Sequence, residues 1–242
     1  IAQLPVREPD RLIAVSHNSP ERGRGRGFPD GFVRALDADR RVLDGVLARG
    51  GMERVTLGTE TGGEPAIGEL VSGSFFDVLG IAPAAGRLLT RADDEVPGAH
   101  PVIVLSHAFW QRRFGGDPAI VGRTVTVSGH PMTIIGVTPA SFVGLDAGQR
   151  VDLRAPFAMQ AEVRGGPTPA NRTRPRGWEQ EIIARVKPGV SLDRAQHMIG
   201  ASLASFVQSE GLRPAATASP ATPSSAAASP AVARSTTTSS AA

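Results

Sequence analysis

The chain of 242 residues contains no cysteine, few aromatic residues (5%) and one lysine, Lys187, among 26 basic residues. The lack of cysteine excludes disulfides, thiolate catalysis and cysteine-ligated zinc. The formal net charge of +3 is too small to create a field that would steer a polyanionic partner. No run approaches the ~18 apolar residues of a membrane span, so we expect the chain as given to be soluble. It begins at Ile1 without a signal-peptide pattern, and we expect it to be a piece of a longer protein.

Common catalytic signatures are also absent from the sequence. There is no GxSxG elbow, no GxxxxGK[ST] loop and no HExxH helix. Ser72, Ser74 and Ser106 are interpreted as helix-cap or first-turn residues and not as nucleophiles. No two histidines are spaced for a metal-binding helix face, and none stands beside a carboxylate in a familiar motif. We therefore expect no catalytic, cofactor-binding or metal-binding residue; the histidines are His17, His100, His107, His130 and His197.

Three short polar runs admit a functional reading. Asp93, Asp94 and Glu95 could supply calcium ligands, but they lack the spaced oxygens and the glycine of an EF-hand loop, which favours an acidic turn. The run from Arg22 to Gly27, RGRGRG, could be an RNA-binding box, but it is one short copy and favours a solvated loop. Arg112 and Arg113 beside Trp110 could contact a nucleic acid, but we favour a buried Trp110 flanked by two solvated arginines. We therefore expect no nucleic-acid partner.

The N-terminal third predicts strands, one helix and turns. Apolar residues recur at three- and four-residue spacing between residues 30 and 49, which predicts a helix ended by Gly50-Gly51, with a break near residues 37–40 as an alternative. We further expect strands over 11–16, 52–59 and 66–71, a loop over 17–27 and a turn over 60–65.

The stretch from Val71 to Pro139 gives the clearest local signals. Ser72 is expected to cap a short helix that ends at Leu79, with Gly80 in a left-handed conformation beyond it. Ser106 is expected to cap a helix over 107–114, and Asp117 another turn of helix. Alternating residues predict a hairpin over 124–137 with Gly129-His130 at the turn. An unbroken apolar run over 101–105 predicts a buried strand.

The C-terminal part predicts two strands, one long helix and a tail. Strands are expected over 151–157 and 179–186, and a loop over 165–176. Ser191 is expected to cap a helix to about Glu210. The tail, 212–242, consists almost entirely of Ala, Ser, Thr and Pro, and such a composition predicts disorder. The stripe of that helix is Leu192, Ala195, Ile199, Leu203 and Phe206.

Four segments resemble one known family. They are FPD at 28–30, VSGSFFDVLGIAPAAGR at 71–87, the stretch 97–144 with its FGGDP, GR, hairpin and IGV, and WEQEIIARVKPGVSLDRAQ at 178–196. In order and spacing they are similar to the MacB-like periplasmic core domain of ABC transporter permeases, of the acidobacterial type. The resemblance covers roughly residues 10–210.

The resemblance implies a fold and a role. The fold would be α+β in two lobes: a porter-like βαβ lobe from residues 10–70 and 176–211, and a smaller mixed α/β middle lobe with a β-hairpin from residues 71–175, after a membrane-proximal lead-in at 1–9. The role would be a non-catalytic domain at the inner membrane, facing the periplasm, that couples ATP-driven motion to export or release of substrate. The implied partners are an ABC ATPase subunit reached through membrane helices, a second permease copy and a periplasmic adaptor.

The chain departs from the family where it reaches the tail. The family would continue with a further strand and membrane helices, so we expect a truncated or excised chain. If that closing strand is missing, the lobe that contains residues 179–186 would have an unpaired edge. Two other classes stay open. A soluble extracytoplasmic binding module would need a deep pocket. An enzyme would need clustered ionisable groups, for example around His107, Asp94 and Arg113.

Overall fold

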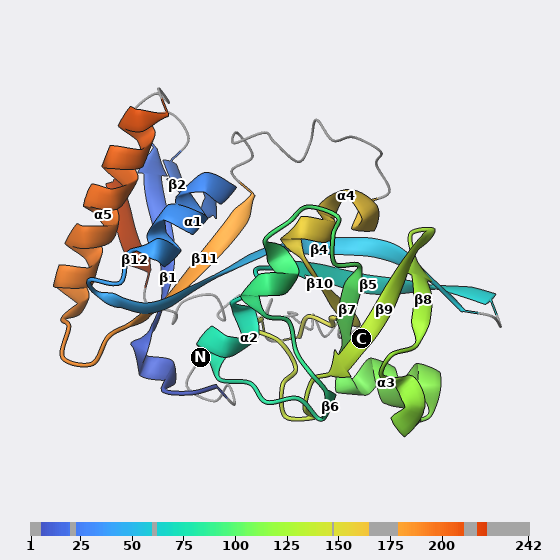
Figure 1. Cartoon of the computed structure of the whole chain (residues 1–242). Helices are drawn as coiled ribbons and strands as arrows, with labels where there is room; N and C mark the ends of the chain where they lie inside the picture. The colour runs from blue at the N-terminus through green and yellow to red at the C-terminus, as the bar shows by residue number, and fades with distance from the viewer. Residues whose placement is uncertain are drawn as a thin grey trace, which may run out of the picture.

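A single long strand, β4 (Leu43–Thr59), runs across the molecule and joins its two halves (Figure 1). The structure, a computed structural model, describes residues 6–19, 23–59, 62–146, 148–164, 179–210 and 217–221. The first half of β4 pairs with β11 (Gln180–Val186), and the second half pairs with β5 (Gly62–Val71), both antiparallel. The β4–β5 register shifts between Arg49 and Met52, at Gly50-Gly51, so the glycines mark a bulge inside a strand.

The other strands extend this sheet in both directions. The order is β12-β1-β11-β4-β5-β10-β7-β9-β6, and β8 pairs with both β4 and β9. Only β5–β10 and β7–β9 are parallel pairs among the described strands, so the architecture is a mixed α/β one with a largely antiparallel sheet. The remaining strands are β1 (Leu12–Ser19), β2 (Gly23–Gly25), β3 (Gly27–Phe28), β6 (Ala85–Gly86), β7 (Val102–Leu105), β8 (Thr124–Val127), β9 (His130–Val137), β10 (Leu153–Pro156) and β12 (Thr217–Ala221).

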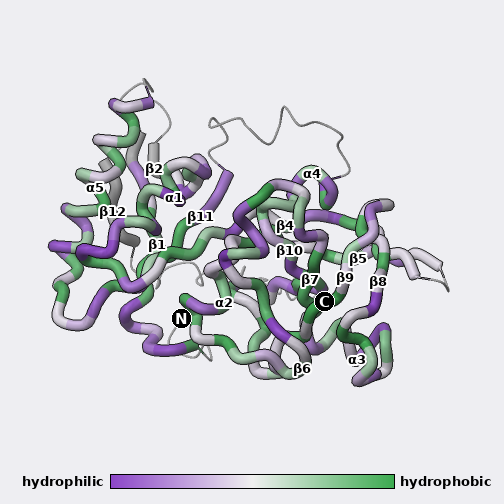
Figure 2. Tube along the Cα trace, viewed as in Figure 1, coloured by the Kyte–Doolittle hydropathy of each residue, from purple (hydrophilic) through white to green (hydrophobic). Residues whose placement is uncertain are grey.

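The helices pack on this sheet at separate places. In Figure 1, α1 and α5 lie together beside β1, β11 and β12, and α3 lies at the opposite end of the molecule. Along α5 the hydropathy changes repeatedly, as expected for a helix with one buried face (Figure 2). None of the helices in the described ranges has the length and hydropathy required to span a membrane. The helices are α1 (Asp30–Ala38), α2 (Phe75–Leu79), α3 (His107–Phe114), α4 (Gln160–Val163) and α5 (Leu192–Ser209), with 3-10 turns η1 (Pro9–Arg11), η2 (Arg91–Asp94), η3 (Pro118–Ile120) and η4 (Phe157–Met159).

Buried apolar side chains form three clusters. The first lies between α1, α5 and the strands β1, β11 and the first half of β4. The second gathers α3 with the strands β5, β7, β8, β9, β10 and the second half of β4. The third surrounds α2 and includes Leu47, Val71 and Phe142. Strand β4 contributes to all three, since Val46, Leu47 and Val55 lie in the first, third and second cluster.

The predicted helix over 30–49 is wrong after residue 38. Helix α1 ends at Ala38, and residues 43–49 are strand. The apolar residues here are buried on both faces: Val46 packs in the first cluster and Leu47 in the third. A strand buried on both faces has a continuous apolar run, which periodicity cannot distinguish from a buried helix.

Most predictions from local capping and turn chemistry are confirmed. Ser106 Oγ accepts the amide of Phe109 at 3.2 Å, and Ser191 caps α5 in the same way at Arg194. Gly80 has φ of 71°, as a left-handed residue after α2 requires. In the β8–β9 hairpin the turn residues are Ser128 and Gly129, both with positive φ, so His130 belongs to the strand and not to the turn.

Other expectations need correction. The residue before α2 is Ser74, and Ser72 is not its cap. Part of the RGRGRG loop is strand, since β2 pairs with β1 and β3 with β11. In α5, Leu192 is exposed, and Val207 takes a buried place instead.

The end of the chain also differs from the expectation. Residues 217–221 form β12, which pairs with β1, so disorder is wrong for these five residues. Strand β11 has β1 on one side and β4 on the other, and β12 is the last strand of the sheet at this end of the described residues. The predicted loop at 165–176 and the rest of the tail lie outside the described residues.

Candidate functional site

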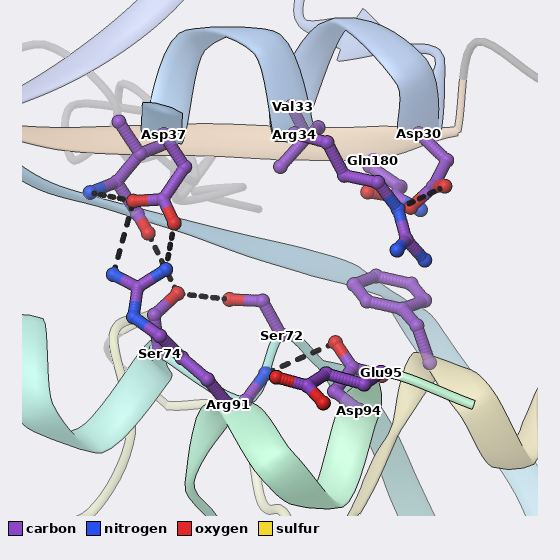
Figure 3. A pocket seen from close by; sticks show the side chains of 13 residues that line it. Asp30, Val33, Arg34, Asp37, Ser72, Ser74, Arg91, Asp94, Glu95 and Gln180 are labelled. Carbon is purple, nitrogen blue, oxygen red and sulfur yellow. Dashed lines mark hydrogen bonds and ion pairs between the residues drawn. The ribbon is translucent and has the colours of Figure 1, made fainter. Parts of the chain in front are cut away.

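A small cleft lies between α1 and η2, above β4 and the β5–α2 connection (Figure 3). Its volume is about 200 Å³. Small-molecule sites typically enclose roughly 300–1,000 Å³, so the cleft is small for a ligand pocket. It is lined by Asp30, Val33, Arg34, Asp37, Val46, Ser72, Gly73, Ser74, Arg91, Asp94, Glu95, Phe157 and Gln180.

An ion pair closes one end of the cleft. Arg91 at the start of η2 pairs with Asp37 on α1, and its Nη2 donates to Asp37 Oδ1 at 3.1 Å. Asp37 Oδ1 also accepts the backbone amide of Val46 at 3.2 Å. The Asp37 carboxylate therefore links α1 both to β4 and to η2 on the opposite wall of the cleft.

Two serines on the β5–α2 connection hold the floor of the cleft. Ser72 Oγ accepts the amide of Ala48 at 2.9 Å, and Ser74 Oγ donates to Val46 O at 2.6 Å. The two hydroxyls lie 3.0 Å apart. Both hydroxyls are hydrogen-bonded to β4, so they attach the start of α2 to the centre of the sheet.

Asp94 joins two chain segments beneath the cleft. Its carboxylate accepts the amide of Gly73 at 3.0 Å and the amide of Ala158 at 2.7 Å. Burial raises the pKa of Asp94 to about 6, while the two amide bonds act in the opposite direction. Gly73 must be glycine, because a Cβ there would lie 2.3 Å from Thr90 O. The β5–α2 connection and η2 are thus in close backbone contact.

The neighbouring Asp93 has a different role. It closes a capping box with Thr90 and forms an ion pair with Arg87 at 2.7 Å. Burial raises the pKa of Asp93, but the bonds from Arg87 and Thr90 outweigh it and hold this pKa below its ordinary value. The two aspartates of the predicted acidic turn are therefore engaged by amides, a hydroxyl and a guanidinium. Among the described residues, no three His, Asp or Glu side chains converge as metal ligands.

A second polar centre lies on the opposite side of β4 and β5. Arg154 is 2% exposed and donates to Glu69, also 2% exposed, at 2.7 Å. The Arg154 guanidinium lies over the rings of Phe75 and Phe142, 5.5 and 5.0 Å from their centres. Arg49 at the bulge of β4 continues the network and contacts Glu181 at 2.8 Å and Asp146 at 2.6 Å.

The residues proposed for catalysis are not assembled. Asp94 lines the cleft, whereas His107 packs edge-on against Trp110 on α3, and Arg113 donates to Thr59 and lies 3.5 Å from Glu64. The other histidines have local contacts where the structure shows them. His17 Nε2 lies 3.1 Å from Gly27 O, and His197 Nδ1 lies 2.7 Å from Asp193 O.

The residues proposed for nucleic-acid binding also have intramolecular partners. Trp110 Nε1 donates to Asp117 O at 2.9 Å, and Arg112 donates to Asp152 at 3.2 Å. The Arg112 guanidinium also lies 5.0 Å from the Phe109 ring centre.

Sequence reasoning missed the buried charges. Glu69, Arg154 and Arg185 each stand inside an apolar strand run (AIGELV, VDLRAP and EIIARV). A charged residue at such a position must find a partner, because an unpaired buried charge is costly. A charged residue inside an apolar run is therefore a signal that the sequence does carry. The sequence does not indicate the partners, because they are far away along the chain.

Comparison with known proteins identifies similar domains. Residues 2–202 match the family model described as MacB-like periplasmic core domain. The fold is similar to the periplasmic region of MacB from Actinobacillus actinomycetemcomitans (TM-score 0.62, 17% identity, 88% of this chain and 89% of that one). It is also similar to a domain of a putative permease protein from Porphyromonas gingivalis (TM-score 0.61, 15% identity, 89% and 92%). A third similar structure is the extracellular domain of the transporter YknZ from Gram-positive bacteria (TM-score 0.57, 14% identity, 87% and 100%).

One curated sequence is also similar. It is the probable syringafactin export ATP-binding/permease protein SyfD of Pseudomonas syringae pv. tomato, 30% identical over 131 residues. The match spans 54% of this chain and 18% of that protein, so the chain corresponds to a small part of it.

Proposed function

The chain belongs to the family of MacB-like periplasmic core domains of ABC transporter permeases, and on this premise we propose that it couples ATP-driven motion across the membrane to export or release of substrate. The match to the family over residues 2–202 carries this proposal. The similar fold of the MacB periplasmic region supports it. In this role the domain needs no catalytic, cofactor or metal site of its own.

The proposal includes two lobes that move relative to each other. The porter-like lobe comprises residues 10–70 and 176–211, the middle lobe residues 71–175, and residues 1–9 form the lead-in from the membrane. The separate first and second hydrophobic clusters support two bodies. Val55 and Leu57 on β4 pack in the second cluster, so we place the outer part of the β4–β5 hairpin mechanically with the middle lobe.

The contacts across the cleft suit a reversible motion. The Arg91–Asp37 pair is partly exposed, and an exposed ion pair contributes only about 0–1 kcal/mol. Breaking it would therefore cost little. Strand β4 would act as the continuous connection between the bodies, with its bulge at Gly50-Gly51 as the place where bending is easiest.

The proposed setting follows from the family. The domain would face the periplasm at the inner membrane and receive motion from an ABC ATPase subunit through membrane helices. The other proposed partners are a second permease copy and a periplasmic adaptor. We propose no nucleic-acid partner. The alternative, a soluble binding module, is less well supported, because the cleft of about 200 Å³ is below the roughly 300–1,000 Å³ of typical ligand sites.

The motion can be tested in the full-length permease without knowing its substrate. Spin labels can be placed at Arg34→Cys and Glu95→Cys on opposite walls of the cleft, since this chain itself has no cysteine that would be labelled. Any cysteine elsewhere in the permease is replaced first. In proteoliposomes with the ATPase, ATP should change the distance between these labels. A matched pair on one lobe, Arg41→Cys and Asp193→Cys, should keep its distance. An identical distance distribution for the cleft pair with and without ATP would contradict the proposal.

A further inference from the structure

Arg185 on β11 is buried, with its side chain 1% exposed. Its guanidinium donates to backbone carbonyls of two other segments. Nε and Nη2 donate to Val78 O at 3.0 and 2.8 Å, near the end of α2. Nη2 also donates to Arg7 O, and Nη1 donates to Glu8 O at 3.1 Å. One side chain on β11 thus holds both the C-terminal end of α2 and residues 7–8.

Carbonyls provide most of the compensation for this buried charge. The nearest carboxylate is that of Glu8, at 3.8 Å, and it is half exposed. Val78 O is one of the last carbonyls of α2, which have no acceptor role within the helix, so it is free to accept from the guanidinium. Burying a charge without a close counter-ion is costly, and an apolar residue of similar volume often gives equal or greater stability. Arg185 is therefore better explained by the segments it positions than by the stability it supplies.

Residues 6–8 have further contacts with the same region. The Arg7 amide donates to Leu79 O at 2.8 Å, and Val6 packs in the third cluster. The fit is close at Gly80, where a Cβ would lie 2.6 Å from Arg7 Cβ. Glu8 has φ of 41°, a conformation that non-glycine residues adopt only when their surroundings fix it.

We propose that Arg185 is a positioning residue that fastens residues 6–8 to β11 beside the end of α2, so that the entering segment and the first cluster move as one body. This inference rests on the proposed function, in which residues 1–9 lead in from the membrane. A displacement of residues 6–8 would then reach β11 directly and would not be lost in a flexible linker. Arg11 supports the same junction, since its Nε donates to Val186 O at 2.8 Å.

Hydrogen exchange tests the fastening in this chain. Arg185→Met removes every guanidinium donor and keeps a long apolar side chain. The Arg7 amide should then exchange at least tenfold faster, and the amides of Gly80 and Ile81 should follow. The amide of Ile134 in β9, distant in the fold, should stay within twofold of the wild type. The matched control is Arg41→Met, because Arg41 forms an exposed ion pair with Asp39 away from this junction.

Two results would overturn the inference. One is an unchanged Arg7 exchange rate in Arg185→Met. The other is an equal acceleration of Arg7 and Ile134, which would indicate a general stability role. If Arg185→Met does not fold, Arg185→Lys serves instead. A lysine ammonium cannot reproduce the fork that spans Val78 and residues 7–8, so the Arg7 amide should exchange at a rate above wild type by at least threefold. A rate equal to wild type would count against the inference.

Label distances test whether the entering segment moves with the first cluster. Asp10→Cys and Gln208→Cys are exposed positions on η1 and α5. Their distance distribution should be narrow in the wild type and at least twice as wide in Arg185→Met, with Arg41→Met unchanged. A narrow distribution in Arg185→Met would overturn the inference. These measurements need no ATPase, so they can fail while ATP-driven movement of the cleft succeeds, and the reverse.

Discussion

Arg91 and Asp37 form an ion pair across 54 residues of sequence, and this pair bridges two walls of the cleft, η2 and α1. Arg91 is 44% exposed and Asp37 only 16%. Asp37 also accepts a hydrogen bond from the backbone amide of Val46 in β4. Replacing Asp37 would therefore weaken the attachment of α1 to β4 as well as the ion pair. The two residues are therefore unequal partners in the contact.

We predict a small coupling energy between these two residues. Arg91→Gln should lower the free energy of unfolding by no more than about 1 kcal/mol, because exposed ion pairs contribute about 0.2–1 kcal/mol. Asp37→Asn should cost more, since it also weakens the bond to the Val46 amide. Urea denaturation of both single variants and the double variant gives the coupling. A coupling well above about 1 kcal/mol would indicate a rigid cleft, which contradicts the reversible contact proposed above.

The raised pKa of Asp94 should make the stability of the protein depend on pH in an unusual direction. Its pKa in the folded chain is about 6, against an ordinary value of 3.8. Because the folded state binds the proton more tightly, the stability from protonation is complete below pH 3.8 and is lost as the pH rises through 6. The difference between the two values corresponds to about 3 kcal/mol. Asp94→Asn should remove this dependence.

The measurement is urea denaturation of wild type and Asp94→Asn between pH 4 and 7.5. The free-energy difference, wild type minus variant, should increase toward low pH. Asp93→Asn is the matched control, and its free-energy difference from wild type should stay nearly constant over this pH range. The pKa of Asp93 is held low, so its contribution is present above pH 3.8 and disappears as the pH falls. Equal slopes for the two variants would show that these environments are assigned wrongly.

The buried pair of Glu69 and Arg154 should be strongly coupled. Glu69→Gln leaves the Arg154 guanidinium buried beside Phe75 and Phe142 without its carboxylate. We expect a loss of about 3–5 kcal/mol, the usual cost of breaking a buried pair from one side. Arg154→Met in the same background should recover part of that loss. Strict additivity of the two substitutions in thermal or urea unfolding would contradict the coupling.

Elements controlled by local chemistry could be predicted from sequence. The caps at Ser106 and Ser191, the left-handed Gly80 and the β8–β9 hairpin each depend on a few neighbouring residues. The first half of β4 could not, because a strand buried on both faces shows the same apolar spacing as a buried helix. The cleft could not either. Its Asp37–Arg91 contact and the Asp94–Ala158 bond join residues 54 and 64 positions apart, and single-sequence patterns carry no such pairing.

Strand β12 provides the last prediction, because composition alone suggested that its residues would be disordered. Thr217–Ala221 pair antiparallel with Ala14–Asn18, opposite the side of β1 that contacts β11. The segment pairs with β1 through its backbone, so its side-chain composition does not reveal it. Removing residues 217–221 should expose the edge of β1 and raise amide exchange at positions 14–18 that face β12 by about tenfold.

The effect should be local. Residues Leu12 and Ile13 pair with β11 and should keep their protection. The matched control is a deletion of five residues beyond 221, which should leave β1 unchanged. Should positions 14–18 exchange equally in both deletions, β12 would not protect β1 in solution. An increase confined to the first deletion would show that a segment of Ala, Ser, Thr and Pro covers an edge that would otherwise be open to pairing with another chain.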